Sequence, residues 1–312
     1  MKNKIRIFLM ILLVVFATAY LIPTPHHPIS ELYDGKDQTV LNSLFTFRQV
    51  PIQSLDYEGN KWKYLVTGRG KESILFLHGM AGNYDFWWQQ TNAFKDDYRI
   101  VSVTYPPVSS LAEMGKAITV ILDKNNMQKV NVVGSSLGGY FAQYLLATYP
   151  NRIKKAVFGN TFPPNDLLEK QNSKLVVIAK ILPEWLMMHF LRQGLYKNVI
   201  PAAQNDPLAK AVLVENTYGR MSKAQFVARY NCVVDKFQPN NDLQKQRDIM
   251  IFEADNDPLV PVELRIKLKQ LYPQAQVHTF HGKGHFPYLN ATVEYNQALK
   301  QFLLDSLKVI TN

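Results

Sequence analysis

One short glycine- and serine-rich segment constrains this chain more than any other. Apolar residues 130–133 predict a strand, residues 134–139 (GSSLGG) follow at once, and the next residues predict a helix that runs up to Pro150. A G-x-S-x-G motif between a strand and a helix indicates a sharp turn with a strained central residue. Ser136 would then stand exposed above the sheet as a candidate nucleophile, and the Leu137 N–H at the helix N-terminus would be oriented to bind an anion.

The candidate acids lie in loops that follow strand-like runs. A histidine that acts as a base needs a carboxylate to fix its tautomer and stabilise the imidazolium. Asp257, which follows the strand-like residues 249–252, is the preferred acid. Asp255 in the same loop is the close alternative and is otherwise expected to cap the turn. Asp166, after the preceding predicted strand, is a weaker alternative.

The candidate bases follow residues 277–280, which also resemble a strand. His285 is the preferred base to take the proton from Ser136, and His281 at the strand end is the alternative. Loops at the carboxyl ends of strands carry functional groups in open α/β sheets. The order serine, aspartate, histidine at three such ends favours a triad of Ser136, Asp257 and His285.

The other half of an oxyanion hole is predicted from an apolar strand, residues 74–77, that runs straight into His78-Gly79. The residue after this dipeptide would donate its backbone N–H, so Met80 is paired with Leu137 as the two donors. His78 is expected to be structural and to bond the backbone of its own loop.

These motifs together resemble the α/β-hydrolase superfamily and, within it, the maspardin-like branch. The superfamily resemblance is carried by His78-Gly79, the Ser136 turn, residues 257–261 and Gly284-His285. The branch resemblance is carried by residues 98–101, 105–106, 134–143, 159–162, 231–232, 271–273 and 286–289. It implies an α/β fold with a mostly parallel central sheet, helices on both faces and an inserted helical cap. Animal maspardins are generally described as binding proteins without a standard triad, whereas this chain keeps serine, aspartate and histidine, which favours an active hydrolase.

The start of the chain has the pattern of a targeting segment. Lys2, Lys4 and Arg6 precede apolar residues 8–17. Residues 5–22 would span roughly 27 Å as a helix, just short of a hydrocarbon core of ~30 Å. Residues 17–19 (ATA) also fit a cleavage site. Residues 1–22 are therefore predicted to be a signal-anchor, which is preferred, or a cleaved signal peptide. Export follows, to a membrane-anchored extracytoplasmic position or, after cleavage, to the periplasm or medium.

The remaining residues are expected to form one α/β domain with an insertion. Residues 23–44 are predicted as a linker and residues 45–51 and 62–67 as two opening strands. Strand and helix signals then alternate up to residue 162 and resume at residue 249. The predicted organisation is a core of residues 45–162 and 248–312 and a helical cap of residues 163–247.

Composition excludes several classes of function. The formal charge of +10 is spread along the chain, without a basic run interleaved with aromatic residues, so no nucleic-acid partner is expected. The single cysteine, Cys232, is expected to be a small buried residue. The sequence shows no cysteine and histidine cluster with metal-ligand spacing and no phosphate-binding loop, so neither a metal nor another cofactor is expected.

The expected function is an exported serine hydrolase, similar to carboxylesterases and lipases, that acts on an ester or lipid with a hydrophobic acyl group. The apolar cap residues 175–182 and 185–191 either line the acyl pocket or face a membrane, or they only pack the cap onto the core. The candidate pocket residues are Trp87, Trp88, Trp185 and Met188.

Two alternative functions remain. A peptidase similar to proline iminopeptidases would need acidic cap residues, such as Glu169, Glu184 or Glu215, to hold a free amino terminus. A protein of another class, a non-catalytic and membrane-tethered relative of maspardin, would bind partners that the sequence does not identify.

Overall fold

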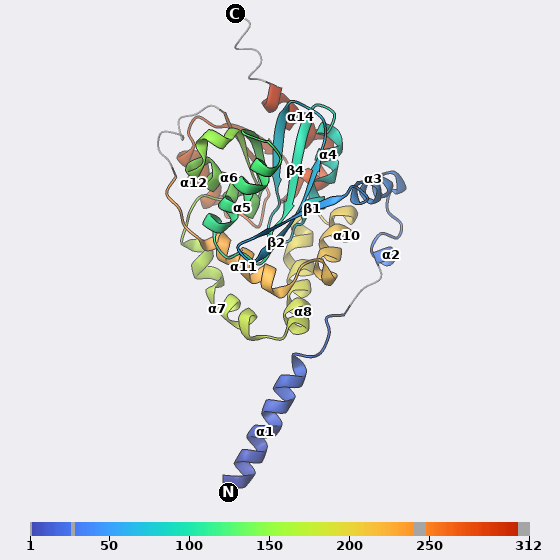
Figure 1. The fold of residues 1–312 in the computed structure, drawn as a ribbon, viewed down its shortest axis with the longest axis vertical. Coiled ribbons are helices and arrows are strands. Elements are labelled where there is room, and N and C mark those ends of the chain that lie inside the picture. The colour runs from blue at the N-terminus through green and yellow to red at the C-terminus, as the bar shows by residue number, and fades with distance from the viewer. Residues whose placement is uncertain (1, 26–28, 240–247, 305–312) are drawn as a thin grey trace, which may run out of the picture.

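A mostly parallel sheet forms the centre of the molecule (Figure 1). The computed structural model describes residues 2–25, 29–239 and 248–304. The strand order in these residues is β1-β2-β4-β3-β5-β6-β7-β8, in which β1–β2 and β2–β4 are antiparallel and every later neighbour is parallel. The strands are β1 Ile52–Tyr57, β2 Asn60–Thr67, β3 Glu72–Leu77, β4 Tyr98–Thr104, β5 Val130–Ser135, β6 Ile153–Gly159, β7 Ile249–Ala254 and β8 Gln276–Phe280.

The central strands are continuous apolar runs because helices cover both faces of the sheet. Successive residues of β3 alternate between the faces. Ile74 and Phe76 join one buried cluster with residues of α4 and α14, whereas Leu75 and Leu77 join another with residues of α5, α6 and α12. These helices are α4 Trp88–Phe94, α5 Leu111–Lys124, α6 Leu137–Thr148, α12 Val262–Leu271 and α14 Thr292–Leu304. The predicted α/β-hydrolase fold is confirmed.

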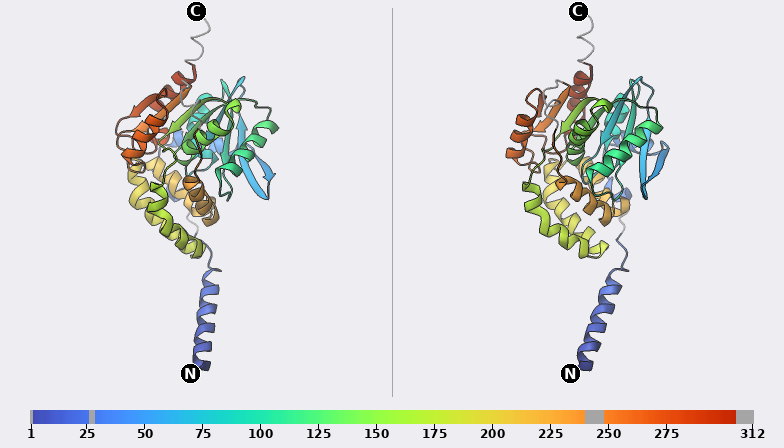
Figure 2. Two further views of the ribbon diagram at one scale, coloured as in Figure 1. Left: turned by 90° about the vertical axis from the view of Figure 1, so that its left-hand side faces the viewer. Right: turned by 60° about the vertical axis from the view of Figure 1, so that its left-hand side comes forward.

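A helical cap interrupts the sheet between β6 and β7 and gathers at one end of the strands, as the yellow and orange helices of Figure 2 show. The prolines of this stretch divide it into short helices, one of which begins at Pro207. Its main helices are α7 Leu167–Ile181, α8 Glu184–Gly194, α10 Pro207–Glu215 and α11 Lys223–Val234. Shorter turns are η3 Leu195–Val199, α9 Ile200–Ala202 and η4 Asn216–Arg220.

The first predicted opening strand is wrong. Its residues up to Arg48 belong to helix α3, Gln38–Arg48, and β1 begins only at Ile52. Helical spacing starts upstream of the predicted strand: Leu41, Leu44 and Phe47 are buried on one face, and Asp37 caps the first turn by accepting from two backbone N–H groups. Strands β1 and β2 are joined by a tight hairpin connection at residues 58–59.

Residues 23–44 are not a simple linker, because they contain α2 (Ile29–Leu32) and most of α3. Arg48 at the end of α3 forms 2.6 Å ion pairs with both Asp85 and Glu215. Arg220 of the cap also pairs with both carboxylates, and the Tyr33 hydroxyl donates to Glu215. Asp85 and Glu215 are almost completely buried. A buried ionic cluster therefore joins the N-terminal helices, the core and the cap.

Helix α1, Lys2–Ala19, projects away from the body at the cap end (Figure 1). Its apolar side chains from Ile5 to Phe16 are each more than half exposed. Among the residues that the structure describes, no helix combines the length and the apolar character needed to cross a membrane. Helix α1, which lies within the predicted signal-anchor of residues 1–22, does not meet this requirement.

Candidate active site

Ser136 occupies a strained turn between β5 and α6. Its φ of 57° and ψ of −122° lie in a region that a residue with a side chain rarely adopts. Three hydrogen bonds hold this conformation: the Ser136 N–H donates to Gly159 O at 2.8 Å, and Ser136 O accepts from the Thr161 hydroxyl at 2.7 Å and from the Tyr140 N–H at 3.0 Å. The strain is thus maintained by β6 and the loop that follows it.

Two glycines allow the backbone to pass through this turn. A Cβ on Gly134 would lie 2.0 Å from Gly138 O, and a Cβ on Gly138 would lie 2.1 Å from Leu77 O. Both distances are far inside van der Waals contact, so the close approach of β5, α6 and the end of β3 requires glycine at these positions. The motif in the sequence has its spacing for this steric reason.

Asp257 and His285 form a buried pair at the ends of β7 and β8. His285 Nδ1 lies 2.7 Å from Asp257 Oδ2, and the two residues are 3 % and 4 % exposed. Asp257 also accepts from the Asn160 amide at 3.0 Å and from the Leu259 N–H at 2.9 Å. Burial raises the pKa of Asp257, but the facing His285 and these hydrogen bonds outweigh it and hold that pKa below its usual range. The carboxylate is therefore ionised and ready to orient the imidazole.

The alternative acid and base pair with each other instead. His281 Nδ1 lies 2.8 Å from Asp255 Oδ2, with the side chains 82 % and 48 % exposed, and Asp255 also accepts from the Gly282 N–H. The second alternative acid, Asp166, is exposed and pairs with Lys236. Two aspartate–histidine pairs thus stand at the same two strand ends, and burial distinguishes them.

Asn160 connects the strained Ser136 turn with the buried Asp257–His285 pair, a role that the sequence did not indicate. Gly159 O holds the Ser136 N–H, and the next side chain, Asn160, donates to both Asp257 Oδ2 and Gly284 O. The only signal for Asn160 in the sequence is that it belongs to residues 159–162, one of the motifs that resemble the maspardin-like branch. Its positive φ of 41° belongs to the tight turn after β6, a conformation that asparagine tolerates.

The predicted oxyanion loop, residues 79–82, lies against the Ser136 turn. A Cβ on Gly79 would be 3.1 Å from Ser136 Cβ, so the two backbones are adjacent. Leu137 is the first residue of α6 and is buried, whereas Met80 is half-buried. His78 is fully buried; its Nδ1 lies 2.7 Å from Gly79 O and its Nε2 accepts from the Tyr105 N–H at 3.4 Å. His78 bonds the backbone of its own loop, as expected.

His78 should make stability depend on pH. Burial and the nearby Arg229 guanidinium hold the pKa of His78 well below its usual range, although its bond to Gly79 O acts the other way. Below pH ~6.5 the unfolded chain takes up a proton that the folded protein excludes, so the free energy of unfolding should fall by up to ~1.4 kcal/mol per pH unit. Urea unfolding of the wild type and His78→Asn at pH 7.5 and 5.5 would measure this. Equal pH dependence in both proteins would contradict it.

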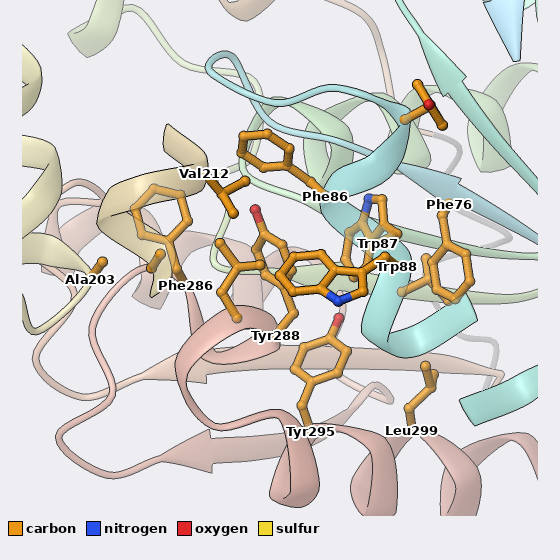
Figure 3. Close-up of a cluster of buried hydrophobic side chains, with 14 of the residues drawn as sticks. Phe76, Phe86, Trp87, Trp88, Ala203, Val212, Phe286, Tyr288, Tyr295 and Leu299 are labelled. Atoms are coloured by element: carbon orange, nitrogen blue, oxygen red, sulfur yellow. The ribbon is translucent and has the colours of Figure 1, made fainter. Parts of the chain in front are cut away.

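The candidate pocket residues Trp87 and Trp88 are packed in the core. Trp87 is fully buried and stacks on Phe76 at 4.9 Å and on Tyr288 at 4.5 Å between ring centroids (Figure 3). Trp88 is also fully buried, and its Nε1 donates to the Ser43 hydroxyl. Trp87 thereby supports the segment that follows His285.

The other two candidates face the N-terminal segment. The half-buried Trp185 donates through Nε1 to Ala19 O at 2.8 Å, at the end of α1. The buried Met188 lines a cavity of about 640 Å³ together with Thr24, Glu184 and Arg220. These two apolar residues of α8 therefore meet the N-terminal segment and a cavity at the cap.

Cys232 is a small buried residue, as expected. It has no exposed surface, and burial raises the pKa of its thiol to about 12.

Comparison with known proteins agrees with this fold. The family model described as "alpha/beta hydrolase fold" matches residues 72–292, which is more than half of the chain. The chain belongs to the α/β-hydrolase family. Its similarity to maspardin is also present over most of its length. Maspardin of Danio rerio is 25 % identical over 230 residues, which cover 72 % of this chain and 71 % of maspardin.

Several hydrolytic enzymes are also similar over comparable lengths. A 2-hydroxy-6-oxononadienedioate/2-hydroxy-6-oxononatrienedioate hydrolase of Paraburkholderia phymatum is 23 % identical over 261 residues, covering 77 % of this chain and 90 % of that enzyme. Among solved structures, an enol-lactonase from Burkholderia xenovorans superimposes with a TM-score of 0.67 at 13 % identity, over 80 % of this chain and 99 % of the lactonase. A thermophilic esterase from Thermogutta terrifontis gives 0.64 at 14 %, over 81 % and 98 %.

Proposed function

We propose that this protein is a serine hydrolase that cleaves an ester or related acyl bond through an acyl-Ser136 intermediate. The observation that carries the proposal is that the end of β6 connects the nucleophile to the acid and base. Two successive residues hold the strained Ser136 backbone and the buried Asp257–His285 pair. The similarity to hydrolases, among them an enol-lactonase and an esterase, supports a hydrolytic reaction.

In the proposed reaction His285 removes the Ser136 proton as Oγ attacks the substrate carbonyl carbon. The oxygen of the tetrahedral intermediate accepts from the Met80 and Leu137 N–H groups, and Asp257 stabilises the imidazolium. Collapse of the intermediate breaks the acyl–oxygen bond, and the leaving alcohol takes the proton from His285. Water, with His285 again as base, then attacks the acyl carbon and releases the carboxylic acid and free Ser136.

The proposed substrate has a hydrophobic acyl group. This is supported by an apolar side chain beside the proposed base: the Phe286 ring lies edge-to-face on His285, with 4.9 Å between the ring centroids. Each acyl CH₂ bound should contribute up to ~0.8 kcal/mol, so kcat/KM should rise along a series of p-nitrophenyl esters from two carbons towards eight. Aminoacyl-arylamides serve as the control. A clear preference for acetyl esters or for the arylamides would contradict this substrate class.

The peptidase alternative has weaker support, because each of its candidate acidic residues already has a partner in the structure. Glu215 is buried and paired with Arg48, Glu169 pairs with Lys236 at 3.3 Å, and Glu184 accepts from the Lys223 N–H at 3.0 Å. The binding-protein alternative is decided by labelling with a fluorophosphonate, which reacts only with an activated serine.

Export is part of our proposal because residues 1–22 have the pattern of a targeting segment. Fractionation of cells that express the full chain would test it, and recovery from the cytoplasm alone would contradict it.

A further inference from the structure

A buried cation of the cap is bonded only to neutral groups in the described part of the chain. Arg229 of α11 is 1 % exposed, and its guanidinium donates to Met80 O at 2.7 Å, to Gly82 O at 3.0 Å and to Tyr105 O at 3.3 Å. Burial lowers the pKa of Arg229 to about 10. A charge buried without an opposite charge destabilises a fold, so this arginine needs an explanation beyond packing.

Two of the three carbonyls that Arg229 binds, Met80 O and Gly82 O, belong to the oxyanion loop, residues 79–82. Every carbonyl of this loop has a partner. Arg229 holds Met80 O and Gly82 O, and the Asn216 amide of the cap donates to Ala81 O at 2.6 Å. Gly79 O interacts with His78 Nδ1 and accepts from the Gly82 N–H. Arg229 and Asn216 of the cap thus bond the loop carbonyls that the core residues leave without a partner.

Peptide geometry connects these bonds to the oxyanion donor. In a planar trans peptide the C=O and the N–H point to opposite sides. Gly79 O and the Met80 N–H belong to one peptide, so bonds that hold this oxygen fix the direction of that N–H. Arg229 holds the next peptide through Met80 O, which prevents the loop from turning a carbonyl towards the position of the oxyanion. A carbonyl there would repel the developing negative charge.

We propose that Arg229 is a positioning residue that locks the oxyanion loop, so that the cap holds part of the catalytic site in its working geometry. The inference rests on the proposed serine-hydrolase function. It assigns a task to the cap that is distinct from substrate selection. The loss of Arg229 should therefore weaken transition-state binding more than substrate binding.

A second buried arginine of the cap supplies a matched control. Arg192 of α8 is 6 % exposed, donates to Thr217 O at 3.3 Å and lies over the Tyr218 ring at 4.5 Å. Like Arg229 it is a buried cation that bonds a backbone carbonyl, but the bond to Thr217 O lies within the cap. Arg192→Met should lower the thermal midpoint without changing turnover.

The experiment compares the wild type, Arg229→Met and Arg192→Met, each as the full chain. We expect Arg229→Met to lower kcat on a short p-nitrophenyl ester by ~10²–10³-fold, the loss typical of one oxyanion donor, with little change in KM. Affinity for a trifluoromethyl ketone, which forms a tetrahedral adduct on the nucleophile, should fall by a similar factor. Arg192→Met should retain both the wild-type kcat and the wild-type affinity for the ketone. A purely structural role for Arg229 would lower the thermal midpoint in both variants and leave kcat and ketone affinity unchanged.

Each further outcome is also decisive. If Arg229→Met does not fold, Arg229→Lys keeps the charge but lacks the fork that reaches three carbonyls, so it should lose kcat and ketone affinity at constant KM. Wild-type values in a folded Arg229→Lys protein would overturn the inference. A wild type that neither hydrolyses esters nor reacts with a fluorophosphonate would overturn the proposed function, and this inference with it. An active wild type together with an active Arg229→Met would remove this inference alone.

Discussion

Replacing Ser136 with alanine is expected to abolish ester hydrolysis and fluorophosphonate labelling and to leave the fold intact. Without Oγ no acyl intermediate can form, and loss of the nucleophile lowers kcat by about 10⁶-fold in a well-studied serine hydrolase. Alanine has the same Cβ as serine, so the strained φ of 57° is unchanged and the three hydrogen bonds that hold the turn involve only the Ser136 backbone. Turnover, probe labelling and the thermal midpoint measure the three expectations.

Ser135 is the matched control for this substitution. It is the last residue of β5, 3 % exposed, and is adjacent to the nucleophile in the chain. Ser135→Ala should keep its labelling. If Ser135→Ala were inactive and Ser136→Ala active, the nucleophile would be the neighbouring serine. If the wild type itself were not labelled, the binding-protein alternative would replace the hydrolase.

Asp257→Asn is expected to lower kcat by up to ~10⁴-fold, by analogy with the aspartate of serine proteases. The amide cannot stabilise an imidazolium by charge, and its NH₂ would favour the wrong tautomer of His285. The substitution also places an amide opposite the Asn160 amide, which now donates to the carboxylate. Steady-state kinetics on a p-nitrophenyl ester measure the loss, with circular dichroism to confirm folding.

Asp255→Asn should have a mild effect, although Asp255 makes the same kind of contact with His281. That pair is exposed, where water screens the charge and an ion pair contributes little. The two substitutions differ in burial while the chemistry is the same, so their ranking tests the assignment directly. A large loss in Asp255→Asn beside a small loss in Asp257→Asn would move the acid to Asp255.

The parts of the fold that sequence patterns predicted are those that depend on local structure. The Ser136 turn follows from glycines that only a close backbone approach requires. The last helix, α14, is likewise visible in the sequence as four apolar residues at helical spacing. All four are buried in α14: Tyr295, Leu299, Phe302 and Leu303. Such patterns are repeated over neighbouring residues, so one chain is enough to recognise them.

The missed features depend on contacts between distant segments. Arg229 resembles any other helical arginine until α11 is packed against residues 79–82. The core position of Trp87, predicted as a candidate pocket residue, cannot be recognised in the sequence, because its stacking partners Phe76 and Tyr288 come from two other elements. The first opening strand was misplaced because the helical period begins before residue 45, in a segment predicted to be a linker.

The ionic cluster around Asp85 and Glu215 extends the folded unit beyond the residues that the family model matches. The family model starts at residue 72, yet Arg48 of α3 supplies a cation to both of these buried carboxylates. A chain cut back to the family boundaries would leave Arg220 as their only arginine among those described here. Removing one partner from a buried charge pair typically destabilises a protein by about 3–5 kcal/mol, a large part of the stability of most domains. The boundary of the homologous family and the boundary of the cooperative folding unit are therefore different in this protein.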